Sequence, residues 1–286
     1  MDFDVRPQGG SGKSPFRYPG GKAVLTPKIY DALSCSDCEI SGYAEPYAGG
    51  AGAAIELLAQ NVVDRLYLND ADPRIFAAWN AILDHNSQFI DRIRDTEITI
   101  DNWRRMHQLV ADPRTADSEF DLGFATFFMN RTNRSGIILG AGPVGGYEQS
   151  GKWKLDARFY RETMIKRVEF FADKREIIIT SNMDGVKFLR SFKAPLARST
   201  FFFIDPPYVT AGSRLYLNTM NEKKHRELSS ALKRKKSIKN WMMTYDDHPL
   251  IHEIYSHAEV GSFPIRYSLQ KKYNERELLI TPRSSL

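Results

Sequence analysis

The sequence predicts an α/β fold built on a largely parallel sheet, and three stretches support this prediction. The run Phe201 to Ile204 is bulky, apolar and uninterrupted, which is typical of a central strand buried on both faces. The segment Pro46 to Ala54 is a glycine-rich turn that leads from a short strand into a helix. Arg65 to Leu68 reads as a second strand, closed by Asn69 and Asp70. Strands that alternate with helices in this way form open parallel sheets.

Composition and charge limit the protein classes that fit this chain. At 286 residues with 42% hydrophobic and 26% charged residues, it can bury one large core, or one core and a smaller module. Forty Lys and Arg against 35 Asp and Glu give a formal net charge of +5, which permits a polyanionic partner without requiring one. There is no apolar run near the length of about 18 residues that a membrane helix needs, and no signal peptide, so a cytoplasmic protein is expected.

The N-terminal stretch contains one misleading motif and one informative one. Residues 1–14 are rich in Gly, Ser and Pro and predict a flexible N-terminus. Gly12-Lys13-Ser14 resembles the end of a P-loop, but the first glycine of that motif would fall at Pro7 and no strand precedes it. A helix is predicted near residues 26–33. Lys22 at its mouth would neutralise a carboxylate ligand and Tyr18 would pack on a flat or cationic group, although a glycine turn with a solvated lysine fits equally well.

The glycine-rich turn and the strand after it indicate a site for a nucleoside. The glycine spacing is not G-x-G-x-x-G, so no dinucleotide fingerprint is present. Asp70 follows the second strand, where a carboxylate can accept hydrogen bonds from both hydroxyls of a ribose, with an ordinary capping aspartate as the alternative. A helix follows, with Asp72 as its N-cap, Pro73 at its first position and one apolar face.

From about residue 85 to residue 167 the pattern changes to helices and polar loops. Apolar spacing predicts helices near residues 103–110 and 120–129, and a polar run and a glycine-rich run follow. In the polar run, Arg131 and Arg134 would reach guanine edges or phosphates, and Asn130 or Asn133 would pair with an adenine edge. A solvated loop is at least as good an interpretation for any one of these residues.

The last third of the chain resumes the sheet. Residues 176–180 predict a strand followed by Asp184, which is placed either to meet the adenine of a cofactor or to occupy a turn. The basic run 233–236 ends a helix and is better explained by solvation and the helix dipole than by phosphate contact. Residues 241–245 predict another strand, and residues 263–269 and 277–281 predict an antiparallel hairpin at the sheet edge.

The end of the apolar run 201–204 carries the chemistry. Pro206 and Pro207 remove two N–H donors and hold the backbone extended, so Asp205 is presented rigidly at the carboxyl end of a strand. The Asp205 carboxylate and the Pro206 carbonyl are two acceptors suited to gripping an exocyclic amino group, whose lone pair is otherwise delocalised into its ring. Tyr208 would stack on the base, a contact worth about 1–3 kcal/mol. The alternative is an ordinary proline turn.

Four stretches, FRYPGGK, AEPYAGGAGA, LNDADPRIFAAWNAI and FIDPPY, occur in this order and resemble the Dam-type (class alpha) family of DNA adenine N6-methyltransferases. The resemblance implies a Rossmann-like fold that depends on S-adenosylmethionine, with an inserted, mainly helical target-recognition domain. Tyr18 stands where the best-known members carry Trp. The sequence departs most after Ile137, so the target sequence is not implied.

The resemblance also implies domains and roles. We expect a flexible N-terminus at 1–14, a catalytic domain at 15–84 and 168–286, and a DNA-reading domain at 85–167. The expected reaction moves a methyl group from S-adenosylmethionine to N6 of a flipped-out adenine in double-stranded DNA, with no metal. The expected catalytic residues are Asp205, Pro206, Pro207 and Tyr208. Cofactor contacts are expected from Tyr18, Gly21, Lys22, Glu45, Pro46, Tyr47, Gly49, Asp70, Asp184 and Asp205, and DNA contacts from Asn130, Arg131, Asn133 and Arg134.

Several alternatives remain open at this point. Methylation of N4 of cytosine needs the same amine chemistry, and a catalytically silent DNA-binding protein on this scaffold is the non-enzymatic alternative. Methylation of RNA or of a protein amide fits the order of motifs less well. Cys35 and Cys38 form a lone C-x-x-C without two further ligands at zinc-site spacing, so free thiols are expected rather than a metal site.

Overall fold

The computed structural model describes residues 13–17, 22–34, 39–210, 220–235, 237–266 and 274–283. These residues form two compact units. The first contains the described parts of Lys22–Ala71 and Ser181–Leu286, and the second those of Lys13–Gly21 and Asp72–Thr180. The later divisions fall at 71/72 and 180/181, whereas the sequence pattern placed them at 84/85 and 167/168. The described residues 13–17 also belong to the second unit, whereas the sequence pattern put residues from 15 onward in the catalytic domain. Tyr18, Gly21, Cys35 and Cys38 lie outside the described residues.

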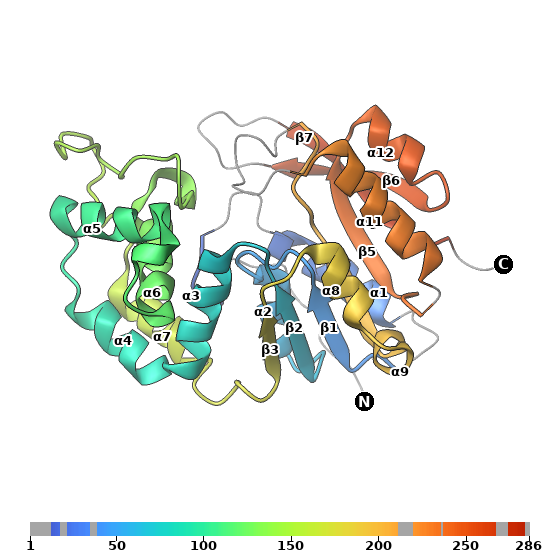
Figure 1. Ribbon diagram of the computed structural model, residues 1–286, viewed down its shortest axis with the longest axis horizontal. Helices are drawn as coiled ribbons and strands as arrows, with labels where there is room; N and C mark the ends of the chain where they lie inside the picture. The colour runs from blue at the N-terminus through green and yellow to red at the C-terminus, as the bar shows by residue number, and fades with distance from the viewer. Residues whose placement is uncertain are drawn as a thin grey trace. The chain divides into compact units, whose positions relative to one another are not determined.

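Within the described residues the strands form a seven-stranded sheet with the order β3-β2-β1-β4-β5-β7-β6 (Figure 1). β1 is parallel to β2 and β4, and β4 is parallel to β5. β7 is antiparallel to both β5 and β6. Its pairing with β6 confirms the hairpin predicted at the sheet edge, and residues 267–269 of the predicted first strand lie outside the described residues. The strands are β1 Gly42–Glu45, β2 Arg65–Asn69, β3 Ile178–Ser181, β4 Thr200–Ile204, β5 Trp241–Asp246, β6 Glu259–Arg266 and β7 Asn274–Thr281.

Strand β4 lies at the centre of the sheet, as its apolar run predicted. All of its residues are buried, and Phe202 is in register with Ala44 of β1 and Trp241 of β5. The Phe202 ring packs edge-on against Phe192 with 4.9 Å between centroids. Burying an aromatic or branched side chain of this size stabilises the fold by about 1.5–3 kcal/mol. A strand made of such residues is therefore held in the middle of the core.

The helices of the first unit cover the sheet. The crossovers β1-α2-β2 and β3-α8-β4 run in opposite directions along the strand order, so the right-handed rule places α2 and α8 on opposite faces. Helices α8 and α11 lie side by side (Figure 1), and their apolar residues share one buried cluster with β4 and β5. The helices are η1 Lys22–Leu25, α1 Thr26–Ser34, α2 Gly52–Ala59, α8 Gly185–Ser191, α9 Ala194–Arg198, α11 Glu222–Arg234 and α12 Pro249–Ile254.

The strand order reverses direction between β1 and β4. Open α/β sheets bind their ligands outside the carboxyl ends of the strands at such a switch point. Glu45 is the last residue of β1, and Asp205 follows the last residue of β4. The topology therefore places these two carboxyl groups at the preferred ligand-binding edge of the sheet.

The second unit is mainly helical. Its helices are α3 Pro73–Asp84, α4 Asn86–Asp95, α5 Ile100–Ala111, η2 Pro113–Thr115, α6 Glu119–Thr132, η3 Arg134–Gly136 and α7 Arg161–Glu169. Helix α6 is buried except for Glu119 and Asp121, and it packs against α3 and α5. A Cβ at Gly123 would lie 2.4 Å from the carbonyl oxygen of Ala77, so glycine is required for this approach of α6 to α3.

In the part of the chain that the structure describes, no helix combines the length and the apolar character that crossing a membrane requires.

Candidate functional site

The candidate site lies at the carboxyl ends of the strands in the first unit, around Asp205. The Asp205 side chain is 20% exposed and stands directly after β4. Its Oδ1 atom accepts a 2.6 Å hydrogen bond from Oγ1 of Thr244 on β5 and lies 3.5 Å from Nζ of Lys22. The site therefore contains a carboxylate that is held by the protein on one side and still partly accessible.

Lys22, at the start of η1, links the DPPY segment (Asp205 to Tyr208) to the antiparallel edge of the sheet. Its ammonium group donates to Oη of Tyr208 at 2.7 Å and to both carboxylate oxygens of Glu277 at 3.1 and 3.3 Å. Lys22 is 7% exposed and Glu277 2%. A buried ammonium group is tolerated only when it is paired and hydrogen-bonded. Asp205 and Glu277 provide this pairing.

Tyr208 packs inside the first unit and is 7% exposed. Its ring centroid lies 6.1 Å from that of Tyr245 on β5, and Nζ of Lys22 lies 5.0 Å from the Tyr208 ring centroid. The backbone after Tyr208 is also anchored to β5, because the N–H groups of Val209 and Thr210 donate to the Asp246 carboxylate at 3.0 and 2.8 Å. Tyr208 and the two residues that follow it are thus held by side chains of the neighbouring strand β5.

Glu45 places a second carboxyl group at this edge. It is 5% exposed and its Oε1 accepts a 3.1 Å hydrogen bond from Oη of Tyr43. Burial raises the pKa of Glu45 to about 8; the Tyr43 hydrogen bond acts in the opposite direction and the charge of Asp205 adds to the rise. Near neutral pH this carboxyl group is therefore mostly protonated.

Among the described residues no cluster of three metal-ligating side chains is present.

Asp70 and the glycine-rich turn meet at the ends of β1 and β2. The Asp70 carboxylate oxygen Oδ2 accepts a 3.0 Å hydrogen bond from the Gly49 N–H, and the Ala48 N–H donates to the Asn69 carbonyl at 2.8 Å. Asp70 lies at the strand end that the sequence predicted. The hydrogen bond from Gly49 fixes the Asp70 carboxylate against the glycine-rich turn. A ligand at this point could therefore contact the carboxylate and the backbone of the turn together.

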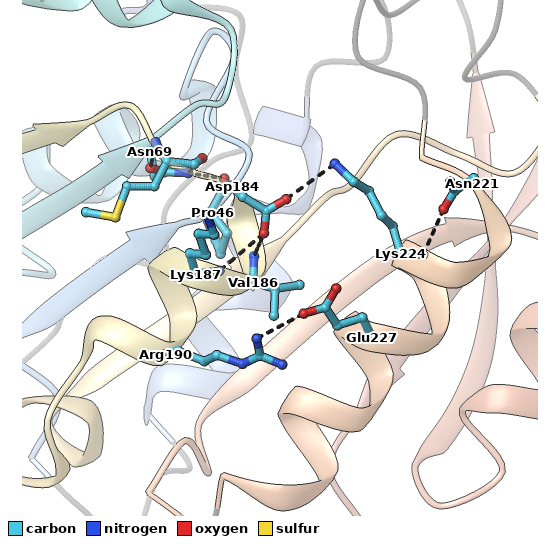
Figure 2. Close-up of polar contacts among 10 residues, drawn as sticks. Pro46, Asn69, Asp184, Val186, Lys187, Arg190, Asn221, Lys224 and Glu227 are labelled. Carbon is cyan, nitrogen blue, oxygen red and sulfur yellow. Dashed lines mark hydrogen bonds and ion pairs between the residues drawn. The ribbon is translucent and has the colours of Figure 1, made fainter.

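Asn69 is a buried residue whose role the sequence did not reveal. Its amide nitrogen donates to the carbonyls of Pro46 and Met183 at 2.8 and 2.9 Å (Figure 2). Its amide oxygen accepts from Oγ of Ser181 at 2.8 Å and from the Met183 N–H at 3.0 Å. One side chain therefore joins the segments that follow β1, β2 and β3. A polar residue inside an otherwise apolar strand end is the signal that identifies such a position.

Asp184, for which the sequence left a cofactor contact and a turn position open, occupies the N-cap of α8. Its Oδ1 accepts from the N–H groups of Val186 and Lys187 at 3.0 and 3.3 Å. Its Oδ2 forms an ion pair of 3.4 Å with Lys224 of α11 (Figure 2). Both of these side chains are partly exposed, at 37% and 53%. The carboxylate thus orients the start of α8 and keeps one oxygen toward a weakly held lysine.

Tyr47 lies against the start of α8. A Cβ on Gly185 would come within 2.4 Å of Cζ of Tyr47, so the ring occupies the space that a side chain at 185 would need. Burial, followed by the charges of Asp184 and Asp70, raises the pKa of the Tyr47 hydroxyl well above its usual range. The hydroxyl therefore stays protonated and is available as a hydrogen-bond donor.

The polar run at the end of α6 requires a correction of the predicted DNA contacts, beginning with Asn130 and Arg131. Asn130 is fully buried, accepts from the Arg17 N–H at 2.7 Å and donates to the Gly136 carbonyl at 2.8 Å. Arg131 is 4% exposed and its Nε donates to the Pro15 carbonyl at 2.8 Å. Both side chains satisfy backbone groups within the second unit and are buried, so in this structure neither is presented at the surface to DNA.

Asn133 needs the same correction. It is fully buried, accepts a 2.7 Å hydrogen bond from Nε1 of Trp103 and donates to the carbonyls of Ile137 and Ile138 at 2.8 and 3.0 Å. The physical reason is that a turn after a buried helix leaves carbonyl groups that need partners. Arg134 differs from the other three residues because it is exposed.

An exposed group of aromatic and basic side chains lies on the second unit. Trp153 is 58% exposed, and Nζ of Lys152 and the guanidinium of Arg158 both lie 5.7 Å from its ring centroid. Arg158 also donates to Oη of Tyr160, which is 55% exposed, at 3.2 Å. These residues, named here the Trp153 patch, were not singled out from the sequence. The alternation in Lys152-Trp153-Lys154 is the signal that could have identified them.

Two of the similar solved structures are of the rRNA methyltransferase aviRa from Streptomyces viridochromogenes. The identities are 12% and 13%, the alignments cover 98% of this chain and 93% of aviRa, and the TM-score is 0.36 in both cases. A similarity of this size does not establish a shared function. No curated protein matches the sequence.

A family model for D12 class N6 adenine-specific DNA methyltransferases matches residues 18–269, which is most of the chain. This match includes the glycine-rich turn, the strand end at Asp70 and the DPPY segment, and it confirms the family resemblance of these motifs. The chain belongs to the D12 class N6 adenine-specific DNA methyltransferase family.

Proposed function

We propose that the carboxyl edge of the sheet around Asp205 is the active site for methyl transfer from S-adenosylmethionine to N6 of an adenine in duplex DNA. The observation that supports this most is the position of Asp205 at the switch point of the sheet, partly exposed and tied to Thr244 and Lys22. Family membership supports an N6-adenine DNA methyltransferase. The structure adds a carboxylate suited to that chemistry.

The amine of adenine is a poor nucleophile because its lone pair is delocalised into the ring. In the proposed arrangement, the Asp205 carboxylate and the Pro206 carbonyl accept hydrogen bonds from the two N6 hydrogens and draw the nitrogen toward tetrahedral geometry. Pro206 and Pro207 keep the backbone extended, so both acceptors stay fixed. Acceptors that are already oriented cost little reorganisation when the reaction occurs.

The residues at the strand ends fit a nucleoside methyl donor. S-adenosylmethionine would supply a methyl group on a sulfonium: the C–N bond to N6 forms as the C–S bond breaks, and S-adenosylhomocysteine leaves. One N6 proton is lost along its hydrogen bond to Asp205. We infer that Asp70 binds the ribose hydroxyls, while Glu45 and Lys22 with the turn Pro46, Tyr47 and Gly49 hold the remainder. Asp184 would accept from the adenine amine once Lys224 moves aside. An exposed ion pair such as Asp184–Lys224 contributes only about 0–1 kcal/mol, so its loss costs little.

The target adenine is paired inside the duplex, so it must be flipped out at a cost of a few kcal/mol. Tyr208 is the proposed stacking partner; its ring is 7% exposed in this structure and would have to be uncovered when the base enters. We propose that the second unit recognises the DNA. Its exposed Arg134 and the Trp153 patch carry positive charge and accessible rings, which suit phosphates and unstacked bases.

Base mapping in DNA treated with the purified protein and S-adenosylmethionine tests this function. N6-methyladenine at a defined sequence is expected. Asp205→Ala should lower the rate by about 10²–10⁴-fold, the range for groups that act directly on a proton in the reaction, while DNA affinity is retained. Asp64→Ala, at an exposed turn, is the matched control and should react normally. Finding N4-methylcytosine would overturn the adenine assignment, and normal turnover by Asp205→Ala would overturn the site.

A further inference from the structure

Thr244 is a buried polar residue beside Asp205, at the carboxyl edge of the sheet where the active site is proposed. It is 0% exposed and precedes Tyr245 on β5, the strand that lies beside β4. Its hydroxyl donates to Oδ1 of Asp205 over 2.6 Å. A buried hydroxyl needs a hydrogen-bond partner, and a donor to an ionised acceptor makes a shorter and stronger bond than one between neutral groups. The partner of Thr244 is the carboxylate on which the proposed chemistry depends.

The two oxygens of the Asp205 carboxylate have different surroundings. Oδ1 accepts from Thr244 and lies 3.5 Å from Nζ of Lys22. Within the residues that the structure describes, Oδ2 has no hydrogen-bond or ion-pair partner. The protein thus binds one oxygen of the pair and leaves the other to a ligand.

Lys22 alone is a poor substitute for Thr244 at Oδ1. Its ammonium group makes shorter contacts elsewhere, at 2.7 Å to Tyr208 and 3.1 Å to Glu277. The terminal torsion of an aspartate is broad, with two nearly equivalent orientations of the carboxylate. Without a close donor, the Asp205 carboxylate would rotate and exchange its oxygens. The Thr244 hydroxyl restricts this rotation.

We propose that Thr244 is a positioning residue for methyl transfer: its hydroxyl fixes the Asp205 carboxylate so that Oδ2 faces the target amine. This rests on the proposed function, because Asp205 is taken as the group that accepts the amine hydrogen bond. A misplaced acceptor loses the advantage of orientation even when the substrates remain bound. The effect of losing the Thr244 hydroxyl therefore belongs in the rate of the bound complex rather than in affinity.

The test compares Thr244→Val, which keeps the shape and removes the hydroxyl, with Thr244→Ser, which keeps the hydroxyl. Single-turnover methylation is measured at saturating S-adenosylmethionine and DNA. Thr244→Val should be about 10- to 100-fold slower, in line with the loss of one hydrogen bond to a charged group. Thr244→Ser should stay within about threefold of the parent rate. The Kd values for S-adenosylmethionine and for DNA should change little in both variants.

Thr200→Val is the matched control. Thr200 is also fully buried, lies on the neighbouring strand β4 and donates to the backbone carbonyl of Leu196 at 2.7 Å rather than to Asp205. The Thr200→Val variant should be less stable than the parent protein, but its single-turnover methylation rate should be unchanged. The proposal is overturned if Thr244→Val reacts at the parent rate, if Val and Ser slow the reaction equally, or if the loss is in affinity alone. Failure of the proposed function is seen separately, as absence of methylated adenine with the unmodified protein.

Discussion

At the scale of single residues, the site is defined by ionisable groups whose charged forms burial would penalise if they stood alone. Lys22, Glu45 and Glu277 are buried, and they share one edge of the sheet with Asp205. Lys22 and Glu277 satisfy each other at 3.1 Å, whereas Glu45 is satisfied by a neutral hydroxyl and is protonated instead. The charge of Glu45 is therefore expected to change between neutral and mildly alkaline pH.

Glu45→Gln should remove a pH dependence of stability. The folded-state pKa of Glu45, about 8, lies above its ordinary value of 4.5, so between these pH values the folded state holds a proton that the unfolded state has released. The contribution of Glu45 to the free energy of unfolding therefore falls as pH rises from about 4.5 to about 8 and is level above. Glutamine stays neutral, so the variant should gain relative stability of up to a few kcal/mol across this window.

Denaturant unfolding of both proteins at pH 5.5 and pH 8.5, without S-adenosylmethionine, measures this difference. All other titratable groups are the same in the two proteins, so their contributions cancel in the difference between the two free energies of unfolding. If the free energies of unfolding of the parent and of Glu45→Gln differ by the same amount at pH 5.5 and at pH 8.5, Glu45 is ionised in the folded state.

At the scale of elements, the ends of three neighbouring strands, β1, β2 and β3, are held together by Asn69. Three of the bonds of Asn69 go to segments that carry proposed donor-binding residues, namely the turn after β1 and the segment between β3 and α8, and the fourth goes to Ser181 at the end of β3. Pro46 and Met183 take part through backbone groups. These contacts therefore depend on the side chain of Asn69 and not on the side chains of Pro46 and Met183. Asn69 therefore couples the stability of the edge to its ability to bind the donor.

Asn69→Ala should lower the free energy of unfolding by about 2–4 kcal/mol, since it removes hydrogen bonds and leaves buried backbone groups without partners. It should also weaken S-adenosylmethionine binding, measured by calorimetry. Asn86→Ala is the control, because Asn86 of the second unit also donates to two backbone carbonyls, those of Ile82 and Val168. That variant should lose stability and keep donor affinity. Parent-like affinity in Asn69→Ala would separate Asn69 from the donor site.

At the scale of the whole molecule, the net charge of +5 gains meaning through its distribution. The buried Arg131 and Lys22 contribute to this total but are already engaged within the protein. Lys152 and Arg158 are exposed and adjacent to an exposed ring. The surface available to a polyanion is therefore smaller than the total charge implies, and the Trp153 patch is its proposed centre.

A double variant, Lys152→Ala with Arg158→Ala, should reduce the dependence of DNA binding on salt. Each cation that neutralises a phosphate contributes about 0.9 to the slope of log K against log salt concentration, so the slope should fall by about 2. Fluorescence anisotropy with a duplex at several salt concentrations measures the slope. Lys28→Ala, an exposed cation on α1, is the control and should leave the slope unchanged. An unaltered slope in the double variant would remove the patch from the DNA interface.

The sequence by itself determined the features that depend on neighbouring residues. The apolar run before Asp205 gave a buried central strand, and Asp72 with Pro73 started α3, where Asp72 accepts from the Arg74 N–H at 3.0 Å. The hairpin at the sheet edge and the strands that end at Glu45 and Asn69 follow from the same short-range patterns. The order of these motifs also identified the family, because each motif is carried by a few adjacent residues.

Only the tertiary structure decided which polar residues face inward. Asn130 is turned into the second unit by Arg17, 113 positions away in the sequence, and Lys22 is paired with Glu277, 255 positions away. A polar side chain is buried when a partner at such a distance satisfies it, and a local pattern of residues contains no record of that partner. For the same reason Thr244, one β-branched residue in an apolar strand, gave no signal until the fold placed its hydroxyl on Asp205.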